Sequence, residues 1–147
     1  MNNTPRLIHH REGCLQAECV TWYRNIWYQK PQNLWATFNE GRDVNTKQSL
    51  GLTPYVSDLL FFTHDRGLVA IEMKFPGETH EVRRIVGQAK WMIEVASSGY
   101  FCDSLEMFQE IIRGGTGIEP ESVLEYCLRL GSQKSMTWDS SKFAKPQ

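Results

Sequence analysis

Apolar residues recur every three or four positions in four segments of the chain, which is the pattern of helices with one buried face. The third segment is preceded by Asp103, a residue type that caps helices, and has Glu106 three positions further on. The pattern predicts helices at Glu12 to about Tyr28, at Glu81 to Ser97, at Ser104 to about Arg113, and from near Pro120 onward.

Shorter segments rich in strand-forming residues lie between these helices. They are Leu34 to Asn39, Val56 to Thr63, Leu68 to Phe75, and Tyr100 to Cys102. The residues from His64 to Gly67 separate the second segment from the third and have turn chemistry, so the pair is expected to form a β-hairpin. The polar stretch from Glu40 to Ser49 is expected to be a loop.

Two charged residues interrupt the second strand of this hairpin. Because side chains alternate along a strand, Glu72 and Lys74 share one face, while Val69, Ile71, Met73 and Phe75 share the other. A connection with an odd number of residues places Asp58 on the face of Glu72, and a two-residue connection places it on the opposite face. Gly67 favours a three-residue loop with a left-handed glycine.

Two carboxylates held a few ångströms apart repel each other, which raises one pKa or requires a cation between them. Oxygen ligands suit Mg²⁺ or Mn²⁺, and the ammonium of Lys74 beside such an ion can orient a water molecule and stabilise charge on a phosphate. Two other interpretations remain open. Glu72 and Lys74 can form an ordinary solvated strand face, or the chain can be an unrelated α/β domain in which Asp58 and Glu72 lie on opposite faces.

Glu12 and Gln88 are two further candidates. Glu12 lies on the apolar side of its helix, pointing inward or toward a site, whereas Glu18 is expected to be exposed. A first-turn carboxylate can equally complement the helix dipole. Gln88 lies on the flank of its helix, where a surface amide is the ordinary interpretation, and Trp91 is expected to cover the core rather than to stack on a base.

Several ordered blocks between Glu12 and about Ile112 resemble the VRR-NUC branch of the PD-(D/E)xK nucleases. The blocks are Gln16 to Arg24, Phe38 to Arg42, the hairpin with Asp58 and Glu72-Met73-Lys74, Gly87 to Trp91, Gly99-Tyr100, and Ser104 to Phe108. The usual Gly-Val before the strand aspartate is Val56-Ser57 here, preceded by Thr53-Pro54-Tyr55, which leaves the ligands intact.

The resemblance implies an α/β, restriction-endonuclease-like fold with a mixed central sheet flanked by helices, plus an extra C-terminal helix. It also implies a metal-dependent endonuclease that hydrolyses phosphodiester bonds of DNA, including branched DNA such as a four-way junction or a flap. The implied catalytic residues are Glu12, Asp58, Glu72, Lys74 and Gln88, the implied ligands of Mg²⁺ or Mn²⁺ are Glu12, Asp58, Glu72 and Met73, and the DNA-contacting candidates are Asn39, Arg42, Arg84 and Lys90. The alternative is a catalytically silent nucleic-acid-binding or interaction module.

The net charge and the cysteines of the chain limit which DNA-binding surfaces and metal sites it can have. The 147 residues carry a net charge of −1, so any phosphate-binding surface must be local. Basic candidates are Arg24, Lys30, Arg42, Lys47, Arg83, Arg84 and Lys90. The four cysteines, Cys14, Cys19, Cys102 and Cys127, lack CxxC spacing and are expected to be reduced thiols that mostly pack in the core, with a metal cluster of Cys14, Cys19, His9 and His10 as a minor alternative.

The chain is expected to form one nuclease-like domain at residues 1–113 and a C-terminal extension at 114–147 packed on it. Within the extension, Ser132 to Gln147 is expected to be poorly ordered, although Trp138 and Phe143 indicate docking. No apolar run has the length of a membrane span or a signal peptide, so a cytoplasmic protein is expected. Symmetric cutting of a junction would need two active sites and therefore a homodimer.

Overall fold

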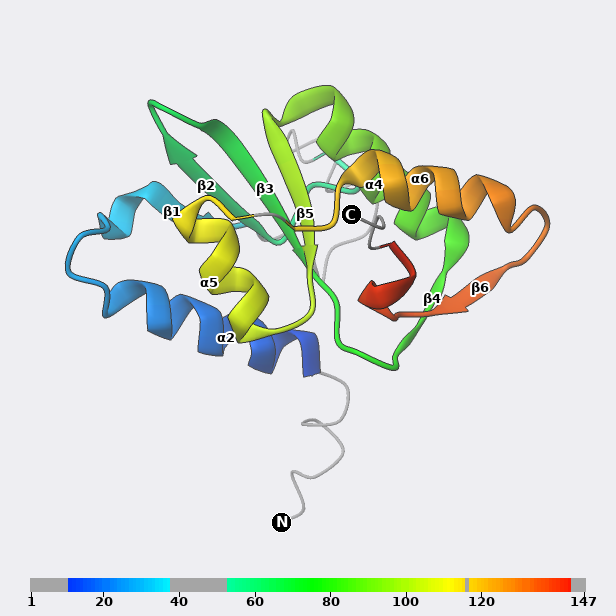
Figure 1. The fold of residues 1–147 in the computed structure, drawn as a ribbon, viewed down its shortest axis with the longest axis horizontal. Helices are drawn as coiled ribbons and strands as arrows, with labels where there is room; N and C mark the ends of the chain where they lie inside the picture. The colour runs from blue at the N-terminus through cyan, green and yellow to red at the C-terminus, as the bar shows by residue number, and fades with distance from the viewer. Residues whose placement is uncertain (1–10, 38–52, 116, 144–147) are drawn as a thin grey trace, which may run out of the picture.

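A four-stranded sheet lies at the centre of the molecule in a computed structural model, which describes residues 11–37, 53–115 and 117–143 (Figure 1). The elements of the first half are α2 (Arg11–Arg24), a 3-10 turn at Pro31–Asn33, β1 (Leu34–Ala36), β2 (Leu59–Thr63), β3 (Gly67–Met73) and β4 (Thr79–Glu81). Those of the second half are α4 (Val82–Val95), β5 (Ser98–Cys102), α5 (Leu105–Arg113), α6 (Pro120–Arg129), β6 (Ser135–Thr137) and a 3-10 turn at Ser140–Phe143.

The strand order of the central sheet is β1-β2-β3-β5. The pairs β1–β2 and β2–β3 are antiparallel, and β3–β5 is parallel, so the sheet is mixed. A parallel pair needs a crossover connection, which here contains α4. The expected mixed α/β architecture is therefore present.

The hairpin has the register that the sequence predicts. Thr63 pairs with Gly67, which leaves a three-residue loop, and Gly67 has a φ of +71°. The strands are shorter than predicted. As a result, Asp58 lies one residue before β2, opposite Glu72 across the register, and Lys74 lies one residue after β3.

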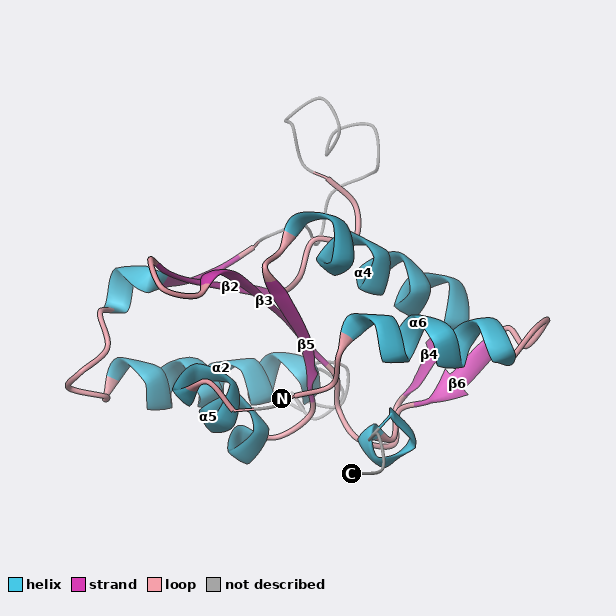
Figure 2. Cartoon of the chain, turned by 45° about the horizontal axis from the view of Figure 1, so that its top comes forward, coloured by secondary structure: helices cyan, strands magenta, loops and turns pink. Residues whose placement is uncertain are grey.

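Helices cover both faces of the sheet (Figure 2). One core lies between the sheet and the pair α2 and α5, and the odd-numbered residues of β3 from Val69 to Met73 point into it. The other core contains Ala70 of β3, Phe101 of β5, and the buried faces of α4 and α6. Glu72 follows Ala70 at the strand period of two, so it faces the α4 layer.

The C-terminal segment is ordered where it is described, contrary to the expectation of a poorly ordered tail. Strand β6 pairs antiparallel with β4 to form a second, two-stranded sheet. The side chains of Trp138 and Phe143 are buried against Phe101 and the second core. Docking of these two aromatic residues is therefore confirmed, and their apolar area explains the order of the segment.

Two details of the predicted helix ends are wrong for local reasons. Helix α2 ends at Arg24 because Asn25 and Ile26 close tighter i to i+3 bonds to Trp22 and Tyr23. Helix α4 begins at Val82 with Glu81 as its N-cap residue, which agrees with the predicted start at about Glu81. Helix α5 is capped by Ser104, whose Oγ accepts the Met107 amide at 3.1 Å, whereas Asp103 accepts the indole N–H of Trp138 at 3.2 Å.

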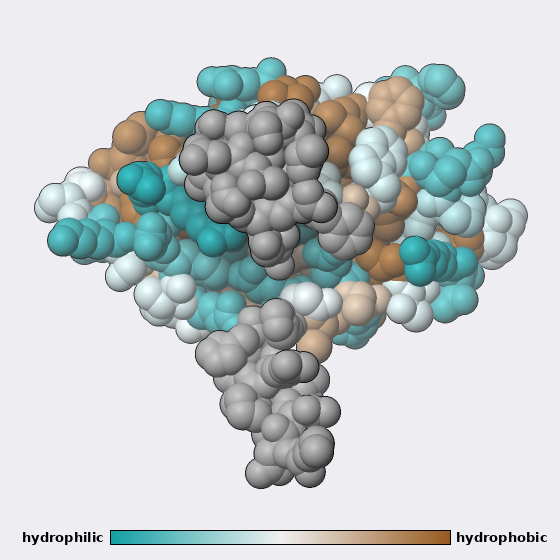
Figure 3. All heavy atoms as spheres, turned by 180° about the vertical axis from the view of Figure 1, so that it is seen from behind, coloured by the Kyte–Doolittle hydropathy of each residue, from teal (hydrophilic) through white to brown (hydrophobic). Residues whose placement is uncertain are grey.

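Among the described residues, eight large hydrophobic side chains are exposed. Trp27 is the most exposed of them, at 92 %. On the face in Figure 3, hydrophilic and apolar side chains are interspersed outside the grey residues. None of the helices in the described ranges combines the length and apolar character that a membrane span requires.

Candidate functional site

Asp58 is fixed in place by the strands on either side of it. The Thr37 hydroxyl donates to the Ser57 carbonyl at 2.6 Å, and the Thr37 amide donates to the Asp58 carbonyl at 3.0 Å. The carboxylate oxygen Oδ2 of Asp58 accepts the Met73 amide at 2.8 Å. This bond crosses from the start of β2 to the end of β3, and it holds the carboxylate beside Glu72.

The residues just before Asp58 lie against α4. Tyr55 has a φ of +68°, which is uncommon for a residue other than glycine. Its ring packs on Gly87, where an added Cβ would meet ring atoms at 2.9 Å. The absence of a side chain at position 87 therefore brings the entry to β2 directly against α4, one residue from Gln88.

Glu72 is the buried centre of the arrangement, with 3 % exposure. The Nε2 amide of Gln88 donates to its Oε1 at 2.7 Å, and Nζ of Lys74 lies 3.6 Å from the same oxygen. Lys74 is 1 % exposed, and its Nζ also lies 5.9 Å from the centroid of the Phe101 ring. The interpretation of Glu72 and Lys74 as a solvated strand face is therefore wrong.

Gln88 is more buried than helical periodicity indicates. The sequence places it at the margin between core and surface, but it is 3 % exposed. Its partner is a buried carboxylate on the sheet below, and a buried polar group must be hydrogen-bonded to avoid a large penalty. The amide is thus held inward by Glu72.

Burial raises the pKa of Glu72 well above its ordinary value, and the charge of Asp58 raises it further, while Lys74 lowers it. Without a bound cation the Glu72 carboxyl therefore tends to keep its proton. Its second oxygen, Oε2, is buried, and a side-chain hydrogen bond with Asp58 adds to the rise in the pKa. Two carboxyl groups this close together are a donor set that a hard divalent cation would bind.

A cavity of about 690 Å³ opens beside these residues. Asp58 and Lys74, the two neighbours of Glu72, line it together with Glu12 from the start of α2. Two arginines, Arg24 at the end of α2 and Arg84 at the start of α4, also line it. The cavity therefore combines carboxylates with three cationic side chains, which is the composition needed to hold a metal ion beside a phosphate.

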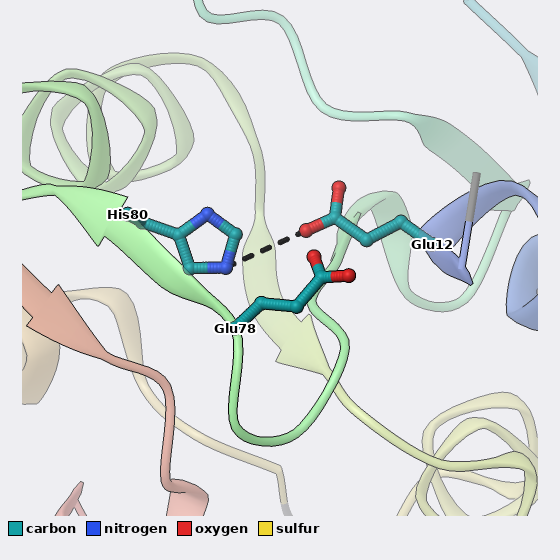
Figure 4. Close-up of side chains that lie close together, drawn as sticks. All are labelled: Glu12, Glu78 and His80. Atoms are coloured by element: carbon teal, nitrogen blue, oxygen red, sulfur yellow. Dashed lines mark ion pairs between the residues drawn. The ribbon is translucent and has the colours of Figure 1, made fainter. Parts of the chain in front are cut away.

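Glu12 points into this cavity, as its helical position predicts, and Glu18 is exposed. Its nearest partners are not those expected. Among the described residues, one group of three metal-ligating side chains has all its ligand atoms within 4.8 Å, and it consists of Glu12, Glu78 and His80 (Figure 4). Glu12 is thus turned toward β4, because the backbone there brings His80 Nε2 to 3.5 Å from Glu12 Oε1.

The electrostatics of this second group differ from those of the Asp58–Glu72 pair. Burial raises the pKa of Glu12, with Lys74 opposing and Asp58 and Glu78 adding to the rise. Burial first, and then the charges of Lys74 and Arg84, lower the pKa of His80 to about 4. The imidazole is therefore neutral at pH 7 and offers a nitrogen lone pair.

The remaining predicted site residues are distributed around the molecule. The side chain of Met73 is fully buried in the core with α2 and α5. Its backbone amide, and not its side chain, contacts Asp58. Lys90 is exposed on α4 and does not line the cavity, and Trp91 packs against the core as expected. Asn39 and Arg42 lie outside the described residues.

The cysteines are reduced thiols, as the sequence predicts. All four are free, and three are buried, with Cys14 exposed. The predicted minor alternative of a cluster with His9 and His10 falls on histidines outside the described residues. Cys14 and Cys19 do not share a burial environment.

Glu78 and His80 are the two residues of the site that the sequence did not indicate. The available signal was their spacing of two, which places both on one face of an extended segment. The segment from Glu78 to Glu81 carries no apolar residue that would predict a strand. Its structure depends on residues 58 to 60 positions later, since Thr79 pairs with Thr137 and the Glu78 carbonyl accepts the Trp138 amide at 2.7 Å.

Comparisons with known proteins leave the family of the chain open. No protein-family model matches the sequence, and neither the curated proteins nor the solved structures give a significant match.

Proposed function

We propose that this protein is a divalent-metal-dependent DNA endonuclease with a restriction-endonuclease-like core of the VRR-NUC type. The observation that carries the proposal is the convergence of Asp58, Glu72 and Lys74 at one end of the β2–β3 hairpin. Glu72 and Lys74 are buried there as a contacting pair, and Asp58 and Lys74 line a cavity. Burying such charges is unfavourable unless they are used together, and a phosphodiesterase site uses all three.

Each residue has a role that follows from its position. Asp58 and Glu72 would hold a Mg²⁺ or Mn²⁺ ion, with Glu12 contributing from across the cavity. When bound, the ion would polarise the phosphoryl group and lower the pKa of the attacking water. Lys74 would orient that water and stabilise the negative charge that develops on the phosphate, and Gln88 would keep Glu72 in position.

Lys74 would carry out its role from a fixed position. Its ammonium lies between the Glu72 carboxylate and the face of the Phe101 ring, and its side chain is 1 % exposed. An immobile cation needs no reorganisation when charge develops nearby, which is the main source of electrostatic stabilisation in enzymes. The position of Lys74 therefore supports a catalytic role rather than general attraction of DNA.

Substrate binding would use Arg24 and Arg84, which line the same cavity from opposite ends of two helices. Guanidinium groups bind phosphates in a bidentate manner, and two of them flanking the carboxylates would place a DNA strand across the metal site. A net charge of −1 fits a local rather than a general DNA-binding surface. Branched DNA, cut by two copies of the chain acting as a homodimer, is the substrate we propose.

The test is cleavage of labelled linear, single-stranded, flap and four-way-junction DNA in Mg²⁺ or Mn²⁺. We expect wild-type protein to cut at least one of these DNAs only when a divalent ion is present. Asp58→Ala should abolish cutting, whereas the matched control Asp65→Ala, an exposed aspartate in the hairpin loop, should not. Tight DNA binding without cleavage in either metal would contradict the proposal and support a silent binding module.

A further inference from the structure

A second group of metal-ligating side chains lies at the edge of the cavity, and it is not explained by the Asp58–Glu72 pair. Glu12 comes from the first turn of α2, Glu78 from the segment before β4, and His80 from β4 itself. Figure 4 shows the three side chains pointing toward one another from these separate elements. Their ligand atoms all lie within 4.8 Å of one another.

Two polar atoms of this group lack hydrogen-bond partners among the described residues. Glu12 Oε1 and His80 Nε2 are both buried, and neither has a hydrogen-bond partner among the described residues. The two atoms are 3.5 Å apart. This distance is at the outer limit for a hydrogen bond, and an imidazole nitrogen that carries no proton is, like a carboxylate oxygen, an acceptor. Leaving two buried acceptors unsatisfied is unfavourable, and a cation between them would remove that penalty.

The spacing fits one ion. Donor atoms around a transition metal lie about 2.0–2.2 Å from it, so two of them can be at most roughly 4.4 Å apart. The observed spread of up to 4.8 Å therefore requires only a small adjustment of the side chains. Three protein ligands would leave coordination positions for water or a phosphate oxygen.

The positions of the ligands are supported by the C-terminal segment. The Gly77 amide donates to the Trp138 carbonyl at 3.0 Å, and the Trp138 amide donates to the Glu78 carbonyl at 2.7 Å. His80 pairs with Met136 in the β4–β6 sheet. Two of the three ligands are therefore on backbone that is held by strand pairing, which is the arrangement that keeps a binding site preorganised.

The donor set indicates the class of metal. Imidazole nitrogen suits transition metals such as Zn²⁺ better than Mg²⁺ or Ca²⁺, which prefer oxygen ligands alone, and the two carboxylates of the group suit Mn²⁺. The two carboxylates supply oxygen ligands with negative charge, which attracts a divalent ion, and the imidazole adds a nitrogen ligand beside them.

We propose that Glu12, Glu78 and His80 form a transition-metal site, distinct from the Asp58–Glu72 pair and sharing the same cavity. The assignment depends on the geometry of these three residues and not on nuclease activity. Glu12 is common to both sites in our account, so an ion here would lie in the cavity that Lys74 also lines.

The experiment is pulsed electron paramagnetic resonance of the full chain with bound Mn²⁺, in the absence of DNA. A histidine nitrogen bound to Mn²⁺ produces a ¹⁴N coupling. We expect this coupling in wild-type protein and in Asp58→Ala, and its loss in His80→Ala. Two controls cover the other histidines of the chain: His64→Ala, on the exposed hairpin loop, and the double variant His9→Ala/His10→Ala should both keep the coupling.

A titration with Mn²⁺ provides the second readout and covers the case in which His80→Ala does not fold. Glu78→Gln should weaken Mn²⁺ binding by about tenfold or more, whereas Glu81→Gln, at an exposed neighbouring glutamate, should not. Absence of ¹⁴N coupling in the wild type, or its persistence in folded His80→Ala, would overturn the site. DNA cleavage without ¹⁴N coupling would leave the proposed function in place and remove only this inference.

Discussion

Replacing Glu72 by glutamine should stabilise the metal-free protein at neutral and alkaline pH. The side chain is 3 % exposed, and burial together with the charge of Asp58 raises its pKa well above the ordinary value of 4.5. Glutamine has the shape of the protonated acid, and its carbonyl can still accept the Gln88 amide. The substitution therefore removes the ionisable group while preserving the packing.

The sign of the effect follows from proton linkage. Above pH 4.5 the unfolded chain has released the Glu72 proton, while the folded protein still holds it, so the folded state binds more protons. Stability of the wild type then falls as pH rises, until the raised pKa of Glu72 is passed. Each pH unit in this window contributes about 1.4 kcal/mol. The advantage of Glu72→Gln should grow by that amount per unit.

The assay is urea unfolding at pH 5, 6, 7 and 8 in the presence of a chelator, for wild type and variant. His80 has the opposite effect on stability, because its pKa in the folded protein is lowered from 6.5 to about 4. As the pH falls from about 6.5 toward 4, the unfolded chain binds a proton at this histidine before the folded protein does, and the folded state loses stability. The raised pKa of Glu12 adds its own slope. Both residues are present in the two proteins, so the difference between the curves reports Glu72 together with its interactions with Asp58 and Glu12.

The matched control is Glu18→Gln, which changes an exposed glutamate on the outer side of α2 and should leave the pH dependence unchanged. Parallel stability curves for wild type and Glu72→Gln would refute the reasoning. They would mean that Glu72 has the same pKa in the folded and unfolded chain, and hence that its burial and its proximity to Asp58 have no energetic effect.

Two further predictions concern the fold that positions the site, and both are measured by urea unfolding. Trp138→Ala should lower the free energy of unfolding by about 3–5 kcal/mol, because the indole is 1 % exposed in the second core. The control Trp27→Ala, at 92 % exposure, should change it by less than about 0.5 kcal/mol, and similar losses in the two variants would contradict the docking of the C-terminal segment. Gly67 and Gly77 both have positive φ, so replacing either by alanine should introduce a backbone strain of about 1–2 kcal/mol. Gly67→Ala should be the more destabilising of the two, because only there would the new methyl group collide with Ser97, and equal losses would contradict the packing of the hairpin loop.

The hairpin could be predicted in detail because its determinants are local. The alternation of apolar and charged residues around Glu72 shows which side chains of β3 share a face, and Gly67 indicates the length of the loop. Together they determine on which face of the sheet Asp58 lies. The helices were predictable in position for a similar reason, since periodicity records which face is buried. Their ends were less predictable, because bonds to neighbouring residues or strands decide them.

The rest of the site could not be predicted because it depends on long-range contacts. The β4 strand exists only through its pairing with β6, and the segment of Glu78 and His80 has no apolar pattern of its own. Gln88 is drawn inward by a carboxylate on another element, which periodicity along one helix does not record. Local pattern therefore identified the Asp58–Glu72–Lys74 group and missed the second one.

The central claim is that the buried Lys74 serves a phosphodiesterase site, and single-turnover DNA cleavage in Mg²⁺ tests it most directly. The variant is Lys74→Met, which keeps most of the side-chain volume and removes the charge beside Glu72, and the control is Lys134→Met, at an exposed lysine. We predict a rate loss of about 100-fold or more for Lys74→Met, with folding and DNA binding retained, and wild-type rates for the control. Undiminished cleavage by folded Lys74→Met would contradict the claim.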